Sequence, residues 1–115
     1  MSLEYTPEFK RAVRKLSRQY RSLRRDLAPL LTALEAGETL GDPLQQVRYP
    51  VFKVRVKNSD AQRGKSGGYR VIYYLKQSDK TVLVTLYSKS HQSDISADDI
   101  RRIVMKYDAT PAESE

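Results

Sequence analysis

The first third of the chain repeats apolar residues at spacings of three and four, the pattern of an amphipathic helix. Thr6, Pro7 and Glu8 provide a helix start: an N-cap hydroxyl, a proline at the first helical position and an acid in the first turn. The pattern is too long for one ordinary helix, so it predicts two helices, over residues 7–20 and 22–36. The repeated apolar residues are Phe9, Val13, Leu16, Tyr20, Leu23, Leu27, Leu30 and Leu34.

Beyond residue 50 the period changes to two. Over residues 51–57 apolar and basic side chains alternate, which predicts a half-buried strand with a cationic outer face. Residues 69–76 and 81–89 are rich in β-branched and aromatic residues and predict a hairpin. On the first strand the outward residues would be Lys53, Arg55 and Lys57, and the inward residues Phe52, Val54 and Val56.

A last helix is predicted from Ser96, whose hydroxyl can cap it, to Tyr107. Residues 108–115 read as a polar tail, and a short strand is an option around residues 3–5. The order predicts one α+β domain over residues 1–107. We expect an N-terminal helical hairpin on a mainly antiparallel sheet of three to four strands, then a C-terminal helix, with the helices on one face of the sheet.

Composition narrows the partners that this domain can have. Among 115 residues there are 21 Lys and Arg against 14 Asp and Glu, a net charge of +7, which favours phosphate-rich or acidic partners unless the charge only aids solubility. The chain has no cysteine and one histidine, so it excludes disulfides and thiolate chemistry, and we expect no metal and no cofactor. No apolar run approaches the roughly 20 residues that span a bilayer. We therefore expect a soluble, cytoplasmic protein with no membrane partner.

The loop from Arg63 to Arg70 contains Gly-Lys-Ser, the end of a nucleotide-binding P-loop. That motif needs a glycine five positions before Gly64, where this chain has Ser59, and it needs a helix after the loop, where this chain predicts a strand. We interpret the glycines as a turn between two strands.

The same turn leads to a possible anion site. Period-two geometry places Arg70 on one face of its strand, where it can lie beside Lys53 and Arg55. Clustered cations repel one another, so the cluster persists most readily when an anion binds there. From the residues alone, a phosphate-binding sheet and a merely solvated cationic face stay open as alternatives.

Four blocks of this sequence resemble the RelE/ParE superfamily of bacterial toxins, and more narrowly its RelE-like and HigB-like members. The resemblance covers nearly the whole chain, and its most specific part is the Gly-Gly-Tyr-Arg-Val-Ile-Tyr-Tyr run. The blocks are Phe52 to Lys57, Gly67 to Tyr74, Leu86 to Lys89 and Ser93 to Ser96.

The resemblance implies the toxin of a type II toxin-antitoxin pair, usually a ribosome-dependent endoribonuclease that cuts translated mRNA. Its partners would then be the ribosome, mRNA and a small cognate antitoxin, with a toxin-antitoxin hetero-oligomer as a further expectation. A gyrase-inhibiting toxin like ParE, or an inactive homologue that only binds its antitoxin, remain alternatives. The resemblance implies that RelE-like enzymes carry functional basic residues at the positions of Lys53, Arg55 and Arg70. Their presence in this chain favours the nuclease.

The resemblance also suggests residue roles. Arg70 suits stabilisation of phosphorane charge, and Lys53 is a candidate base if neighbouring cations lower its pKa. RelE-like proteins place an Arg and a Tyr beyond the last strand, where this chain departs from the pattern, so the general acid is open. His91 could act as that acid or be an ordinary surface histidine. The predicted catalytic residues are Lys53, Arg55, Arg70 and His91, and the predicted RNA or ribosome contacts are Lys57, Arg63, Lys65 and Lys89.

Two other groups of residues have open interpretations. The strand tyrosines could stack on bases, although packing within the sheet is the simpler explanation. The basic face of the first two helices could contact rRNA, dock an acidic antitoxin segment, or be solvated. That face comprises Lys10, Arg11, Arg14, Lys15, Arg18, Arg21, Arg24 and Arg25.

Overall fold

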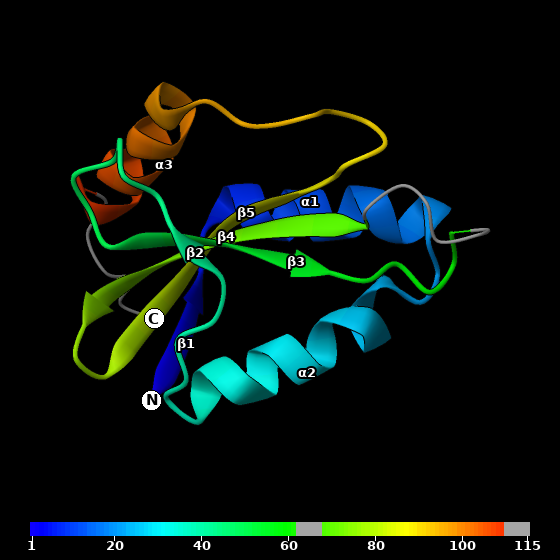
Figure 1. Ribbon diagram of the computed structural model, residues 1–115, viewed down its shortest axis with the longest axis horizontal. Helices are drawn as coiled ribbons and strands as arrows, with labels where there is room; N and C mark the ends of the chain where they lie inside the picture. The colour runs from blue at the N-terminus through cyan, green and yellow to red at the C-terminus, as the bar shows by residue number, and fades with distance from the viewer. Residues whose placement is uncertain (62–67, 110–115) are drawn as a thin grey trace.

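The computed structural model describes residues 1–61 and 68–109, and within them the chain forms three helices and a five-stranded sheet (Figure 1). Every element predicted from the sequence is present, with bounds within about two residues of those expected. The helices are α1 (Pro7–Gln19), α2 (Leu23–Glu35) and α3 (Ala97–Ala109). The strands are β1 (Ser2–Tyr5), β2 (Asp42–Pro43), β3 (Val51–Val56), β4 (Tyr69–Gln77) and β5 (Lys80–Ser88).

The strands lie in the order β1-β5-β4-β3-β2. All neighbours are antiparallel except β1, which runs parallel to β5. The optional strand near residues 3–5 is thus confirmed, and β2 adds a fifth strand where the sequence predicts a loop. Two residues are too few to show a period. Gly41, at a φ of +89°, allows the chain to come close enough to β3 for this short pairing. A Cβ at this position would overlap the carbonyl oxygen of Lys53.

Both faces of the sheet are covered, so the expectation that all helices share one face is wrong. The α1–α2 hairpin packs on the face that presents Tyr69, Val71 and Tyr73, whereas α3 packs on the face that presents Ile72 and Tyr74. These strands are buried on both sides, and a continuous apolar run does not indicate which helix covers which face. Within the described residues, none of the three helices has the length and apolar character needed to cross a membrane.

The helix α3 lies over only one end of its face (Figure 1). Its buried residues Ile100 and Val104 share a core with Val51, Ile72 and Val84. The other end, where β3 stops and β4 begins, carries polar and charged side chains on the same face.

Thr6 connects the start of α1 to the centre of the sheet. Its fully buried hydroxyl accepts from the backbone N–H of Phe9 at 3.0 Å and donates to the carbonyl oxygen of Val84 at 2.6 Å. Val84 is the extra residue of a β-bulge, because Ile72 pairs with Thr85 while Tyr73 pairs with Leu83. The bulge shifts the alternation of β5 by one residue beyond this point.

The helix α3 continues through Asp108 and Ala109, so Asp108 belongs to the helix and not to the predicted tail. Its carboxylate accepts from the Tyr74 hydroxyl at 2.5 Å and lies 3.8 Å from the Lys76 ammonium. The hydroxyl of the preceding residue, Tyr107, donates to Glu4 on β1 at 2.6 Å. These contacts anchor the end of α3 to the sheet, and residues 110–115 lie outside the described part of the chain.

We predict that Glu4→Gln weakens the fold most at neutral pH. The hydrogen bond from Tyr107, together with the Lys80 ammonium 3.2 Å away, holds the pKa of Glu4 below its ordinary value of 4.5. A carboxyl with a lowered folded-state pKa stabilises the fold above its unfolded pKa, and this stabilisation is lost as the pH falls through the folded value. Urea unfolding should show a loss of about 1 kcal/mol at pH 7 and a smaller difference from wild type at pH 3.

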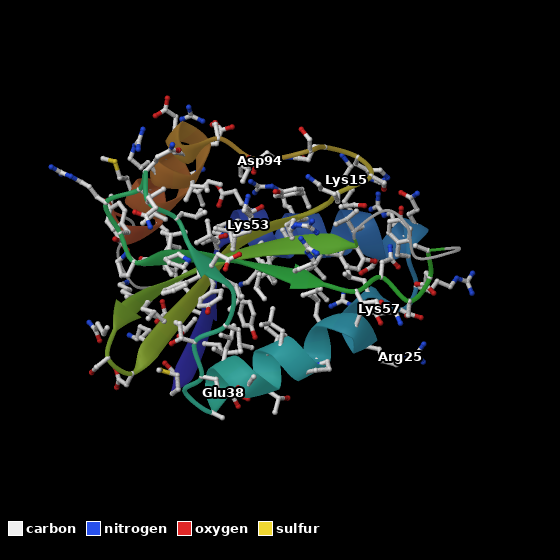
Figure 2. All side chains as sticks on the ribbon, in the orientation of Figure 1. Lys15, Arg25, Glu38, Lys53, Lys57 and Asp94 are labelled. Carbon is white, nitrogen blue, oxygen red and sulfur yellow. The ribbon has the colours of Figure 1, made fainter. Side chains whose placement is uncertain are left out.

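The control is Glu38→Gln, a change of the same chemistry at an exposed residue after α2 (Figure 2). It should leave the free energy of unfolding nearly unchanged at both pH values. An equal loss for Glu4→Gln at pH 7 and pH 3 would contradict the role of the carboxylate.

Candidate functional site

Three of the predicted catalytic residues come together at the open end of the sheet. In the pairing of β3 with β4, Arg55 lies directly opposite Arg70, and Lys53 lies on the same face two residues earlier on β3. Arg55 is exposed and Arg70 is half-buried, with its guanidinium 3.4 Å from the carbonyl oxygen of Tyr69. Two strands of a packed sheet therefore hold three cations side by side.

The last glycine of the predicted turn directs Arg70 to this face. Gly68 has a φ of +66°, and a Cβ there would overlap the carbonyl oxygen of Val56. The chain then enters β4 with Tyr69 fully buried under the helical hairpin, so the next side chain, Arg70, points to the opposite face. Of the remaining loop residues, Arg63, Gly64, Lys65 and Gly67 lie outside the described part of the chain.

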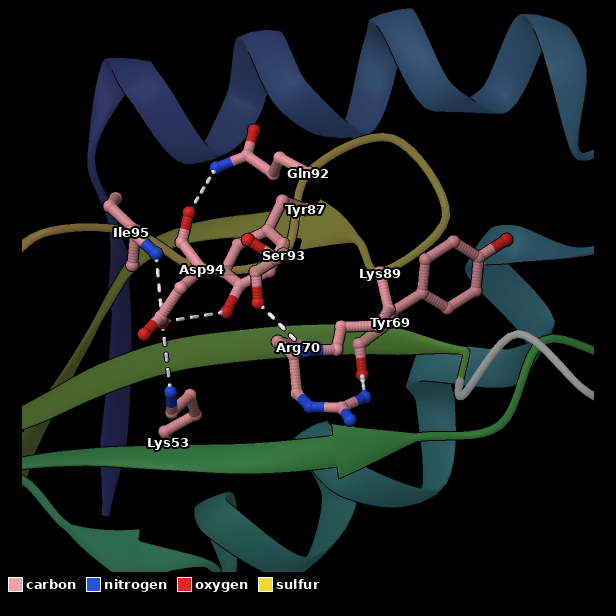
Figure 3. A network of polar contacts seen from close by, with 9 residues as sticks. All are labelled: Lys53, Tyr69, Arg70, Tyr87, Lys89, Gln92, Ser93, Asp94 and Ile95. Atoms are coloured by element: carbon pink, nitrogen blue, oxygen red, sulfur yellow. Dashed lines mark hydrogen bonds and ion pairs between the residues drawn. The ribbon is translucent and has the colours of Figure 1, made fainter.

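A carboxylate from the loop after β5 reaches the cationic end of the sheet (Figure 3). A single oxygen of Asp94 accepts from the Lys53 ammonium at 3.0 Å, the Tyr87 hydroxyl at 3.2 Å and the backbone N–H of Ile95 at 2.8 Å. The hydrogen bond from Lys53 is the main cause that holds the pKa of Asp94 below its usual range. The free protein thus holds Lys53 as the cation of an ion pair.

Tyr87 completes a row across three strands, because it pairs with Arg70, which pairs with Arg55. Its side chain is buried, and this burial raises the pKa of the hydroxyl to about 12. The hydroxyl is therefore protonated near neutral pH and acts as a hydrogen-bond donor.

The sequence prediction did not include Asp94, and it considered Tyr87 only among the strand tyrosines that could stack on bases. Strict alternation from Val82 and Val84 would place Leu86 on this face, and only the bulge brings Tyr87 there. Asp94 lies in a loop without a period, so the sequence holds no signal for its contact with Lys53.

The other predicted site residues lie around this cluster. The ring of His91 stacks on Tyr20 beyond the end of α1, with ring centroids 6.1 Å apart. The Lys89 ammonium donates to the carbonyl oxygen of Ser93 at 2.8 Å, which helps to fold the loop that carries Asp94. Lys57 is exposed just beyond β3 (Figure 2).

Two cavities lie on opposite faces of the sheet. A small one of about 90 Å³ adjoins Lys53 and Asp94 and is walled by the apolar residues Val47, Ile95 and Ile100. A larger one of about 430 Å³ lies on the hairpin face between α1, α2 and β1, with an apolar floor and a basic rim. Its lining residues are Tyr5, Phe9, Lys10, Val13, Arg14, Arg24, Leu27 and Leu31. The larger cavity does not adjoin the three cations, so size alone does not locate the chemistry.

The chain is thus a small basic α+β protein whose sheet presents clustered cationic side chains at one end. Residues 9–110 match the family model described as the RelE toxin of the RelE / RelB toxin-antitoxin system, and the chain belongs to this family. No curated protein matches it. Family membership confirms the resemblance found in the sequence: the protein is a toxin of a toxin-antitoxin system, which implies an antitoxin partner.

We predict that Gly68→Ala destabilises the protein by about 2 kcal/mol or more, because alanine meets both an unfavourable positive φ and the Val56 carbonyl. The matched control is Gly37→Ala after α2, where φ is +93° and a Cβ would meet no described atom within 4 Å. That variant should lose only about 1 kcal/mol, the backbone cost alone. Chemical denaturation of both variants measures the difference, and equal losses would show that the Val56 contact does not fix the turn.

Proposed function

We propose that this toxin is a ribosome-dependent endoribonuclease that cleaves translated mRNA. The observation that carries the proposal is the pairing of Arg55 with Arg70, beside Lys53, on adjacent strands of a rigid sheet. Two guanidinium groups and an ammonium on one face fit a phosphodiester, because each guanidinium can hold two phosphate oxygens.

The reaction is attack of a ribose 2′-hydroxyl on the adjacent phosphate. A base removes the hydroxyl proton, the 2′-oxygen forms a bond to phosphorus, and the bond from phosphorus to the 5′-oxygen breaks. The 5′-oxygen takes up a proton, so the products are a 2′,3′-cyclic phosphate and a 5′-hydroxyl end. Arg55 and Arg70 would stabilise the extra negative charge of the phosphorane, where fixed donors act most strongly.

Tyr87 supports the proposal as the proton donor that the sequence left open. Its hydroxyl is protonated near neutral pH, and it lies in the row with Arg70. His91, by comparison, packs its ring on the helical hairpin. We therefore place Tyr87 ahead of His91 as the general acid.

Lys53 has a conditional role. As the cation of its pair with Asp94 it cannot accept a proton, and in that form it stabilises charge. The role of base that the sequence suggests would require the Asp94 carboxylate to leave Lys53.

Other basic residues support contacts with larger partners. Lys57, just beyond β3, and Lys89, just beyond β5, are proposed to bind RNA or the ribosome. The same role is proposed for Arg63 and Lys65, which lie outside the described residues. The cavity between α1 and α2, apolar with a basic rim, fits an acidic amphipathic segment of the antitoxin by charge complementarity. The toxin would then meet RNA and antitoxin on opposite faces of the sheet.

We predict that Arg70→Ala lowers the single-turnover cleavage rate on programmed ribosomes by about a hundredfold or more, the usual cost of removing a fixed transition-state donor. Arg70→Lys should fall between this variant and the wild type, because lysine keeps the charge but loses the fork. Arg102→Ala on α3, which removes an arginine paired with Asp99, is the control and should retain the wild-type rate.

Mapping of mRNA 5′ ends after induction in cells extends the same test. Cuts within translated frames that disappear with Arg70→Ala support the nuclease. Intact transcripts together with a DNA-damage response would instead favour a gyrase-inhibiting toxin. The absence of both mRNA cleavage and DNA damage would indicate an inactive homologue.

We predict that Tyr87→Phe, which keeps the buried ring and removes only the donor, lowers the single-turnover rate by about a hundredfold. His91→Gln should leave this rate nearly unchanged. Circular dichroism and thermal melts check that both variants fold. A large loss in His91→Gln with an active Tyr87→Phe would return the role of the acid to the histidine.

A further inference from the structure

Three hydrogen-bond donors from three segments converge on one point of the candidate site (Figure 3). They are the ammonium of Lys53 on β3, the hydroxyl of Tyr87 on β5 and the backbone N–H of Ile95 in the loop before α3. The point is occupied by one oxygen of Asp94, at 3.0, 3.2 and 2.8 Å respectively. An ammonium, a hydroxyl and an amide aimed at one position are also the donors that bind a phosphate oxygen.

The carboxylate that fills this position is weakly held. The side chain of Asp94 is 63% exposed, compared with 29% for Lys53. An ion pair in such a setting contributes about 1 kcal/mol at most, because solvent screens it. A phosphate that also reaches the guanidinium groups of Arg55 and Arg70 gains more charge-assisted contacts than Asp94 makes, so it can displace the carboxylate.

The backbone of the loop has its own supports. Lys89 donates to the carbonyl oxygen of Ser93 at 2.8 Å, and the Gln92 side chain donates to that of Asp94 at 2.9 Å. The Asp94 side chain can therefore turn away while Ile95 and its N–H stay in place.

We propose that Asp94 is an internal stand-in for the substrate phosphate, which occupies the three-donor position in the free protein and is exchanged for a phosphate oxygen when RNA binds. The proposal rests on the proposed function, because it takes RNA as the ligand of this face. It has two consequences. Asp94 competes with the substrate for the three-donor position. It also neutralises Lys53 in the free protein, so one cation fewer contributes its full charge to RNA binding.

The test is equilibrium binding of a fluorescent single-stranded RNA decamer with methylated 2′-hydroxyls, which cannot be cleaved, to the full chain over a range of KCl concentrations. Asp94→Asn should bind roughly twofold to fivefold more tightly than wild type at low salt, the range of an exposed ion pair. Its plot of log affinity against log salt should steepen by about 0.7, the increment for one more cation engaging a single strand.

Asp99→Asn is the matched control, since it removes one exposed carboxylate near the start of α3 that pairs with Arg102 and not with Lys53. It adds the same net charge and should not change the slope. A double-mutant cycle locates the effect: Lys53→Gln should weaken binding more in the Asp94→Asn background than in the wild type.

The outcomes separate the two proposals. If wild type binds the RNA and Asp94→Asn binds it equally or less tightly, the stand-in is overturned. The proposal that this face binds RNA would stand. If neither wild type nor Asp94→Asn binds the decamer, the stand-in falls, while the nuclease is decided separately by the cleavage assay on programmed ribosomes. A lower saturating cleavage rate with unchanged affinity in Asp94→Asn would make Asp94 a positioning residue and would also overturn the exchange.

Discussion

The antiparallel pairing of β3, β4 and β5 fixes both the apolar core and the positions of the charged side chains. Along β4 the side chains of Tyr69, Val71 and Tyr73 are fully buried under the helical hairpin, and this burial fixes the register. A slip of one residue would turn the charged Arg70 into that core and move Tyr69 to the open end of the other face, which is strongly destabilising. The apolar core therefore sets the position of the cations on the opposite face.

The cationic part of the site could be predicted from sequence because it obeys a simple period. Alternation along residues 51–57 and 69–76 was enough to group Lys53, Arg55 and Arg70, and the strand pairing agrees. The helix starts were equally readable, since Thr6 and Ser96 cap their helices with side-chain oxygens as expected.

What the sequence could not provide depends on contacts between distant segments. The sequence does not show that α3 packs on the second face, because both faces of β4 are apolar and either could receive the apolar stripe of the helix. Tyr87 reaches the site through a bulge whose carbonyl is satisfied by Thr6, far away in the chain. Asp94 arrives on a loop, and only the folded sheet brings it to Lys53. The missed residues share this origin: each needs a tertiary contact that no local pattern encodes.

The bond between Thr6 and Val84 spans 78 residues, and this has a consequence for biosynthesis. The N-terminal strand and helix are made first, but their partner β5 leaves the ribosome late, and the loop with Asp94 and the helix α3 later still. A nascent chain therefore cannot close its sheet or align Tyr87 with Arg70 until β5 has been translated, because long-range strand pairing has to wait for the last partner. The cationic row is a property of the finished molecule, and a truncated or stalled chain would carry the charges without the arrangement that gives them a use.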